Sequence, residues 1–138
     1  MAPDPTPPTR VASAAISAIG LDHARLCYDY LNNGDLDGYT SLFEADAVVR
    51  RPDAAAIHGR TALERAQHRP GRYLVRTAFS ASGWVATTGS FIAHDQAADR
   101  GVEFADIFTV GNSGLLVAQS TYYFVPPAPN CFTAADCA

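Results

Sequence analysis

The stretch GVEFADIFTVGNSGLLVAQSTYYFV, residues 101–125, decides the fold of this chain. It consists of two β-rich runs, residues 101–110 and 115–125, joined by Gly111-Asn-Ser-Gly114. Two such runs separated by a few chain-reversing residues are typical of a β-hairpin. The stretch therefore predicts a long hairpin in the C-terminal part of the chain.

One face of the first predicted strand is apolar apart from Asp106. Because side chains two positions apart point to the same side of a strand, Asp106 shares its face with four apolar residues. These are Val102, Phe104, Phe108 and Val110. A solvated face would not be built from large apolar side chains, so we expect Asp106 to be buried or to face a pocket. Burial disfavours the charged form of a carboxyl group, which makes Asp106 a candidate acid or base near neutral pH.

The chain before the strands has helical periodicity. Residues 11–19 predict a first helical segment, interrupted near Gly20. Apolar side chains then recur three and four positions apart until Gly34, a common helix stop, so we expect a helix there. Its buried stripe consists of Ala24, Cys27, Tyr28 and Leu31.

Two more helices are expected further along. Asp35 is placed to cap the second helix. The apolar stripe of that helix consists of Leu36, Tyr39, Leu42 and Phe43. A short strand at 47–51 and a loop at 53–58 follow, and the capping box Thr61-Ala-Leu-Glu64 opens a third helix that ends near residue 69. The remaining pattern predicts four strands, at 72–81, 84–94, 102–110 and 115–125.

Helices first and an antiparallel meander afterwards predict an α+β fold. We expect a cone-shaped α+β barrel in which three N-terminal helices pack on a curved, mostly antiparallel sheet. The chain of 138 residues is long enough for one core. We expect a single domain over 13–127, a disordered Pro-rich arm at 1–12 and a C-terminal tail at 128–138.

Composition argues against several function classes. A net charge of -4 gives no electrostatic reason to bind nucleic acid. No apolar run approaches the roughly 20 residues that span a bilayer, so we expect a cytoplasmic protein without a membrane partner. The three cysteines match no zinc motif. Cys27 falls in a helical pattern, whereas Cys131 and Cys137 are either free thiols or the ends of a small disulfide loop.

Four segments together resemble the nuclear transport factor two-like superfamily. They are YLNNGDLDG at 30–38, LFEADAV at 42–48, HGRTAL at 58–63 and DIFTVGNSG at 106–114. The resemblance covers about residues 22–126 and implies the cone fold with a pocket inside it. The superfamily includes ketosteroid isomerases, limonene-type epoxide hydrolases, scytalone dehydratase and the SnoaL-type polyketide cyclases.

The resemblance to ketosteroid isomerases is partial. The oxyanion-hole carboxylic acid of those enzymes falls on Asp106, but their oxyanion-hole tyrosine falls on Cys27. Their proton-shuttling aspartate falls on Arg51, so the base that defines steroid isomerisation is missing. The limonene-type hydrolases need an Arg-x-Asp on the strand at 84–92 and a second Asp near Thr121, and neither is present. The paired Tyr-Asp and the two histidines of scytalone dehydratase are absent as well.

Of the enzymes in this superfamily, the SnoaL-like cyclases resemble the remaining residue pattern best. It implies a cofactor-independent, metal-free enzyme that cyclises, isomerises or dehydrates a polyketide-like carbonyl compound in natural-product biosynthesis. We expect Asp106 to move the proton and Arg51, Tyr123 or His58 to steady negative charge on oxygen. Three alternatives stay open: a structural Arg51–Asp106 ion pair, a non-catalytic ligand-binding or dimerisation domain, and an epoxide hydrolase.

The remaining expectations concern the pocket walls and the assembly. An apolar or polyketide-like small molecule would contact Cys27, Leu31, Tyr39, Trp84, Phe104, Phe108, Gln119 and Thr121. We expect a homodimer formed through the outer face of the sheet, because apolar side chains on an exposed face usually mark an interface. The side chains expected on that face are Val85, Phe91, Ile107, Leu116 and Tyr122.

Overall fold

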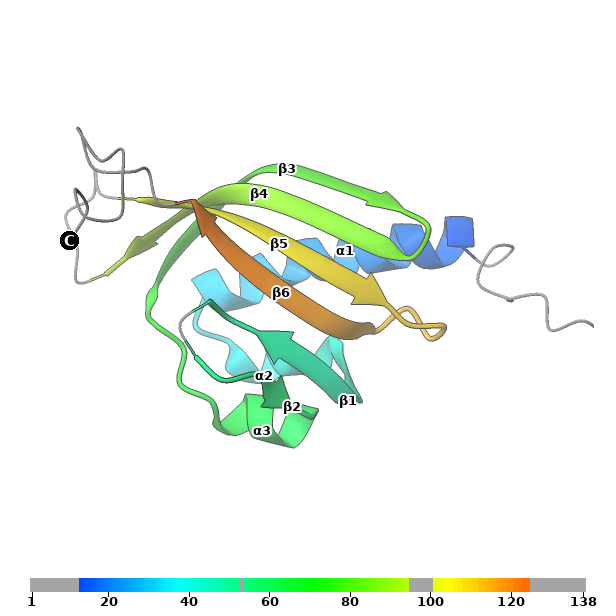
Figure 1. Ribbon diagram of the computed structural model, residues 1–138, viewed down its shortest axis with the longest axis horizontal. Helices are drawn as coiled ribbons and strands as arrows, with labels where there is room; N and C mark the ends of the chain where they lie inside the picture. Colours follow the sequence, from blue (N-terminus) through cyan, green and yellow to red (C-terminus); the bar gives the residue numbers. More distant parts are fainter. Residues whose placement is uncertain (1–12, 53, 95–100, 125–138) are drawn as a thin grey trace, which may run out of the picture.

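The computed structural model describes residues 13–52, 54–94 and 101–124. The arm expected at 1–12 and the tail expected at 128–138, with its two cysteines, lie outside these residues. Helices and strands follow one another along the chain in this order (Figure 1): α1 (Ser13–Asn32), α2 (Leu36–Ser41), β1 (Phe43–Arg50), β2 (Ile57–His58), α3 (Arg60–Arg65), β3 (Gly71–Ala81), β4 (Trp84–Ala93), β5 (Val102–Val110) and β6 (Leu116–Phe124).

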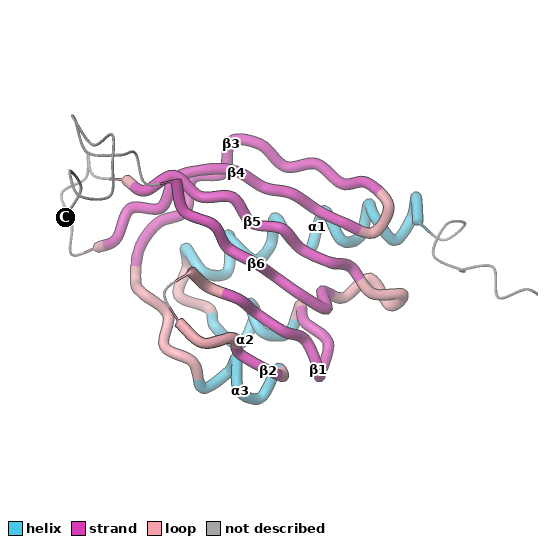
Figure 2. Tube along the Cα trace, viewed as in Figure 1, coloured by secondary structure: helices cyan, strands magenta, loops and turns pink. Residues whose placement is uncertain are grey.

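The six strands form one sheet in the order β2-β1-β6-β5-β4-β3. Neighbouring strands are antiparallel except for β1 and β6, which run parallel. The hairpin expected at 101–125 is formed by β5 and β6, with Asp106 paired to Thr121. Figure 2 shows that the sheet is curved and that the helices lie against one of its faces. The predicted α+β class, with helices packed on a curved and mostly antiparallel sheet, is confirmed, and the sheet is open rather than a closed barrel.

The core lies between the concave face of the sheet and the helices. Along β5 the side chains alternate as the sequence predicts, because Phe104, Asp106 and Phe108 are buried and face α1. Tyr28 of α1 packs its ring against Phe104 and Phe108, with ring centroids 5.7 and 6.3 Å apart. None of the helices in the described part of the chain is long and apolar enough to cross a membrane.

Helix α1 is continuous through Gly20, so the expected interruption at this residue is wrong. Gly20 faces the end of β5, where an added Cβ atom would lie 2.4 Å from Val110 Cγ2 and 2.8 Å from Val110 Cγ1. The glycine therefore permits close packing of the helix on the sheet. A glycine within a helix costs only about 1 kcal/mol relative to alanine, so packing of the helix overrides the local preference.

The second helix is shorter than predicted. The Asp35 cap is confirmed, because its Oδ1 accepts a hydrogen bond of 2.8 Å from the Gly38 N–H. However, α2 ends at Ser41, and Phe43 begins β1. The carbonyl of Leu42 accepts a hydrogen bond of 2.9 Å from the Leu116 N–H, so pairing with β6 starts where the apolar stripe predicts that the helix continues.

The region around α3 also differs from the prediction. Residues 57–58 form β2 within the expected loop and pair with Val48 and Val49 of β1. Helix α3 begins after Gly59 without a side-chain cap, so the capping box expected at 61–64 is wrong. It ends at Arg65, and the chain then runs to β3 without helical structure.

The outer, convex face of the sheet carries different residues from those expected. Val85, Phe91 and Leu116 are buried on the concave face, so their assignment to an outer interface is wrong. In β4 the alternation is opposite to the expected one, and in β6 a register shift between Leu116 and Ala118 turns the Leu116 side chain inward. Tyr122 and Ile107 do belong to the convex face. The exposed large apolar side chains on this face are Leu74, Phe79, Trp84, Tyr122 and Phe124.

Replacing Gly20 by alanine should destabilise the protein, although alanine is the better helix former. Overlap with both methyl groups of Val110 should cost about 1–3 kcal/mol of unfolding free energy, measured by urea denaturation. In a Val110→Ala background the same Gly20→Ala change should cost much less, because the overlapping methyl groups are gone. Equal costs in both backgrounds would contradict the close contact.

Candidate functional site

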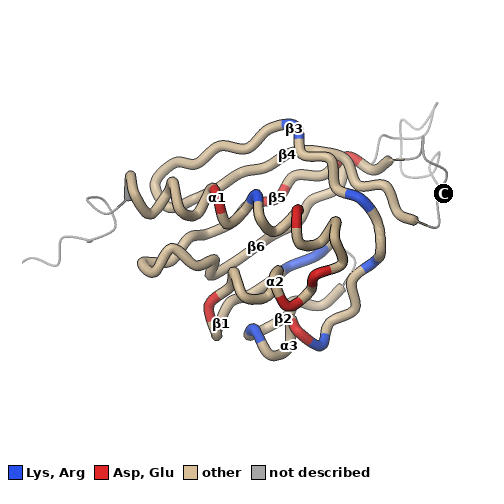
Figure 3. Tube along the Cα trace, turned by 180° about the vertical axis from the view of Figure 1, so that it is seen from behind, with Lys and Arg blue, Asp and Glu red and all other residues tan. Residues whose placement is uncertain are grey.

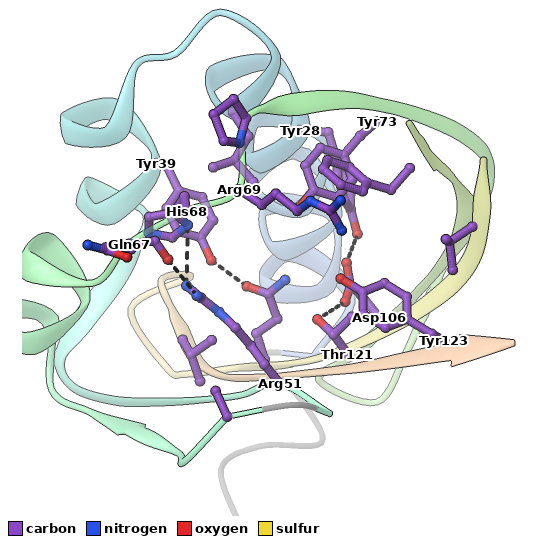
Figure 4. Close-up of a pocket in the computed structure, with 17 residues that line it drawn as sticks. Tyr28, Tyr39, Arg51, Gln67, His68, Arg69, Tyr73, Asp106, Thr121 and Tyr123 are labelled. Atoms are coloured by element: carbon purple, nitrogen blue, oxygen red, sulfur yellow. Dashed lines mark hydrogen bonds between the residues drawn. The ribbon is translucent and has the colours of Figure 1, made fainter. Parts of the chain in front are cut away.

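A cavity of about 680 Å³ lies between the concave face of the sheet, α1, α2 and the connection from α3 to β3 (Figure 4). This volume falls within the range of small-molecule sites. Its apolar walls are Leu31, Val49, Ala54, Pro70, Phe91 and Val102. Its polar lining consists of Tyr28, Tyr39, Arg51, Gln67, His68, Arg69, Tyr73, Asp106, Gln119, Thr121 and Tyr123.

Asp106 occupies one end of this cavity and is only 2% exposed. Its Oδ2 accepts a hydrogen bond of 2.5 Å from the Tyr28 hydroxyl, and its Oδ1 accepts one of 2.5 Å from the Thr121 hydroxyl. The Tyr28 hydroxyl also contacts the hydroxyl of Thr87. Neutral side chains from α1, β4 and β6 therefore surround a single carboxyl group of β5.

The environment of Asp106 raises its pKa. Burial is the largest cause, because the charged carboxylate loses its hydration. Hydrogen bonds from Thr121, Tyr28 and Gln119 act in the opposite direction, since they favour the charged form. The pKa of Tyr28 is raised as well, first by burial and then by the neighbouring charge of Asp106. A carboxyl group with a raised pKa is a stronger base than an ordinary aspartate.

Tyr28 is the residue that sequence reasoning missed at this end of the site. In the resemblance to ketosteroid isomerases, Cys27 takes the position of their oxyanion-hole tyrosine. In the structure, however, the phenol that bonds to Asp106 belongs to the next residue, Tyr28. Cys27 is fully buried in the core, away from the cavity lining, and burial raises the pKa of its thiol. The sequence held one usable signal, because a tyrosine in a buried stripe needs a partner for its hydroxyl.

Arg51 belongs to a second polar group at the other end of the cavity. Its Nη1 donates a hydrogen bond of 2.8 Å to the Gln67 carbonyl, and its Nη2 lies 3.2 Å from His68 Nδ1. Burial, and then the charge of Arg51, lower the pKa of His68. The Arg51–Asp106 ion pair left open above is wrong, since Arg51 points to Gln67 and His68, away from Asp106 (Figure 4).

Tyr39 and Gln119 lie between these two polar groups. The Tyr39 hydroxyl donates a hydrogen bond of 2.7 Å to Gln119 Oε1. The Tyr39 ring also packs edge-on against His68, with ring centroids 5.4 Å apart. Gln119 also lowers the pKa of Asp106 as a polar neighbour, so these side chains lie between the Arg51 end of the cavity and the Asp106 end.

The other sequence candidates divide into three groups. The following line the cavity together with Asp106 and Arg51: Leu31, Tyr39, Gln119, Thr121 and Tyr123. Phe104 and Phe108 are buried in the core rather than in the cavity lining. Trp84 is 58% exposed and pairs with Thr109 on the convex face, so its expected place in the pocket is wrong. His58 is an exposed residue of β2 and does not line the cavity either.

Several lining residues had no sequence signal. Gln67, His68 and Arg69 come from the irregular connection between α3 and β3, where no periodicity indicates which side chains face inward. Tyr73 belongs to β3, and its ring packs against Tyr28 at 5.5 Å between centroids. Among the residues that the structure describes, no group of three or more His, Cys, Asp or Glu side chains could hold a metal ion.

Comparison with solved structures identifies the fold class. An NTF2-like protein from Cytophaga hutchinsonii matches with a TM-score of 0.62 at 11% identity, over 76% of this chain and 89% of that one. A Kribbella flavida protein assigned as a ketosteroid isomerase matches with a TM-score of 0.66 at 16% identity, over 83% and 86% of the two chains. The chain therefore has the NTF2-like fold, as the sequence resemblance predicted.

A third structure of this fold belongs to an enzyme of natural-product biosynthesis. SalBIII, an epoxide hydrolase/cyclase-like enzyme in pyran ring formation in the polyether salinomycin, matches with a TM-score of 0.64 at 14% identity, over 75% of this chain and 89% of that one. No family model matches the sequence, and no curated protein matches it. At these identities the similarity shows the fold alone, so function must be argued from the site.

The raised pKa of Asp106 predicts a pH dependence of stability. An unfolded aspartate titrates near pH 3.9, so the folded wild type loses stability as pH rises from about 4 through the raised pKa. Asp106→Asn removes this ionisation, and its amide can donate to the hydroxyl of Thr121 or Tyr28. The unfolding free energy of the variant minus that of the wild type should therefore increase over this pH window and then level off.

Denaturant titrations across about pH 4 to 8 measure this difference. The control is Asp46→Asn, which changes an exposed acid of β1 and should leave the pH profile close to that of the wild type. A difference between Asp106→Asn and the wild type that stays flat or decreases with pH would contradict a raised pKa.

Proposed function

We propose that this protein is a cofactor-independent enzyme that moves a proton on a polyketide-like carbonyl compound, as in cyclisation, isomerisation or dehydration. The observation that carries the proposal is the buried carboxyl group of Asp106 at a cavity wall, which accepts hydrogen bonds from the neutral hydroxyls of Tyr28 and Thr121. A cationic partner would lower the basicity of this carboxylate, whereas burial raises it. The fold that the chain shares with SalBIII supports a role in natural-product biosynthesis.

Asp106 acts as the base in this proposal. Its carboxylate takes a proton from the carbon next to the substrate carbonyl, and the electron pair of the C–H bond moves into the carbonyl as an enolate. The protonated Asp106 then returns the proton to another position. Tyr28 and Thr121 hold the carboxylate in place during both steps through their hydroxyl groups.

Tyr123 is the proposed donor to the enolate oxygen. It lines the cavity and pairs with Phe104 on the neighbouring strand, two residues from Asp106 along β5. A phenol hydroxyl held beside the substrate can donate a hydrogen bond to the enolate oxygen and so stabilise its developing negative charge. Neither Arg51 nor His58 takes this role, because Arg51 is held at the other end of the cavity and His58 lies outside it.

Proton transfer can be tested without the natural substrate. The purified protein should accelerate exchange of the α-protons of 2-tetralone in D₂O, followed by NMR. Asp106→Asn should lower this rate by about 10²–10⁴-fold, the usual contribution of a general base. Tyr28→Phe should lower it less, since the Thr121 hydroxyl still donates to the carboxylate.

The matched control is Glu103→Gln, which changes a carboxyl group of the same strand on its convex face. This variant should exchange protons at the wild-type rate. Binding of 2-tetralone without any acceleration would favour the non-catalytic ligand-binding domain instead. Exchange by Asp106→Asn within a few-fold of the wild type would remove Asp106 from the mechanism.

We also propose that two copies of the chain pair through their convex sheet faces. The aromatic side chains exposed there give each copy an apolar surface that a second copy can cover. Light scattering should then give about 29 kDa, twice the 14.7 kDa of one chain. The double variant Tyr122→Asp, Phe124→Asp should give a folded monomer, whereas a wild-type mass near 15 kDa at micromolar concentration would contradict the dimer.

A further inference from the structure

The cavity lining is richer in positive than in negative charge. Among the described residues, Asp106 is the one acidic group that lines it, whereas Arg51 and Arg69 both contribute a guanidinium. Figure 3 shows basic residues along the chain from α3 into β3. Arg76 of β3 forms an ion pair with the exposed Glu103 and does not line the cavity. Arg51 is the guanidinium at the end of the cavity opposite Asp106, beside Gln67 and His68 (Figure 4), so an anion at that end meets a positive charge.

Arg51 is oriented at this end but has no charged partner. Its side chain is half-buried, and both of its hydrogen-bonded neighbours, the Gln67 carbonyl and His68 Nδ1, are neutral acceptors. Within the described residues Arg51 forms no ion pair. A guanidinium has five N–H donors, so the two contacts fix its plane and leave donors for a ligand. A partly buried cation with only neutral neighbours is well suited to receive an anion from outside the protein.

We propose that the substrate of this cavity carries a carboxylate that binds Arg51, while its reacting carbonyl lies at Asp106. This inference rests on the proposed function, because it adds a substrate class to the same site. The planar guanidinium of Arg51 matches the two oxygens of a carboxylate, and its single positive charge suits a single negative charge. Two anchors at opposite ends also give the substrate one orientation, with apolar walls such as Leu31 and Phe91 between them.

A pair of matched probes tests the proposal without turnover. Isothermal titration calorimetry compares 6-hydroxy-2-naphthoate with its methyl ester, which has the same ring system and hydroxyl but no charge. The wild type should bind the carboxylate about 10- to 100-fold more tightly than the ester, as expected for a charge-assisted hydrogen bond. The preference should decrease at high salt.

Variants then assign the preference to Arg51. Arg51→Gln should bind both probes with nearly equal affinity, and Arg51→Lys should keep part of the preference because the charge remains. Arg50→Gln is the matched control, because it removes an exposed arginine one position earlier on β1 and should retain the wild-type preference. Circular dichroism and thermal midpoints test whether each variant is folded. If Arg51→Gln does not fold, Arg51→Lys provides the test.

The outcome is independent of the proton-transfer result. Asp106→Asn should lower the rate of 2-tetralone exchange by about 10²–10⁴-fold yet still bind the naphthoate more tightly than its ester. Failure of one proposal can therefore be told from failure of the other. Equal wild-type affinity for acid and ester, or no binding of either, overturns the carboxylate assignment. If Arg51→Gln still binds the carboxylate more tightly than the ester, Arg51 does not hold the carboxylate. The same conclusion follows if Arg51→Lys is folded but binds both probes equally.

Discussion

The rest of the structure depends on the burial of one carboxyl group. Asp106 lies in the middle of β5, and the hydroxyls that satisfy it come from α1 and β6, while Thr87 of β4 joins through Tyr28. A buried polar group without a partner costs about 1–3 kcal/mol, so these side chains are stable inside the protein only when all of them are in place. The network therefore fixes how α1 lies across the sheet, in addition to shaping the site.

Curvature of the sheet explains why a cavity exists beside this network. Register shifts occur between Val75 and Thr77 in β3 and between Thr109 and Val110 in β5, and such irregularities bend and twist strands. Helix α1 packs against the β3–β5 side, whereas the short helices α2 and α3 lie near β1 and β2. The concave surface between them is only partly filled. Many functions are compatible with this shape, so the polar side chains decide what the cavity binds.

Regular alternation is the reason why the sequence predicted the hairpin and the burial of Asp106 correctly. Tyr28 was missed because the resemblance aligned the functional tyrosine with Cys27. Neighbouring side chains in a helix project about 100° apart, so Cys27 points away from the cavity that Tyr28 lines. Trp84 was assigned to the wrong face because β4 carries apolar side chains on both faces and its alternation has no clear phase. His68 lies on an irregular segment, where only the tertiary structure shows which groups converge.

The parallel pairing of β1 with β6 has a consequence for how the protein reaches its folded state. Phe43 pairs with Leu116, 73 residues later in the chain, so the two ends of the domain meet across a long loop. Contacts that are distant in sequence slow folding, because the entropy of closing the loop is lost before the contact is gained. During synthesis β1 emerges before β3, β4 and β5, and it joins their sheet only when β6, the strand between β1 and β5, has followed. A nascent chain that lacks β6 therefore exposes the apolar face that will become the cavity wall, which makes this stage the most vulnerable to aggregation.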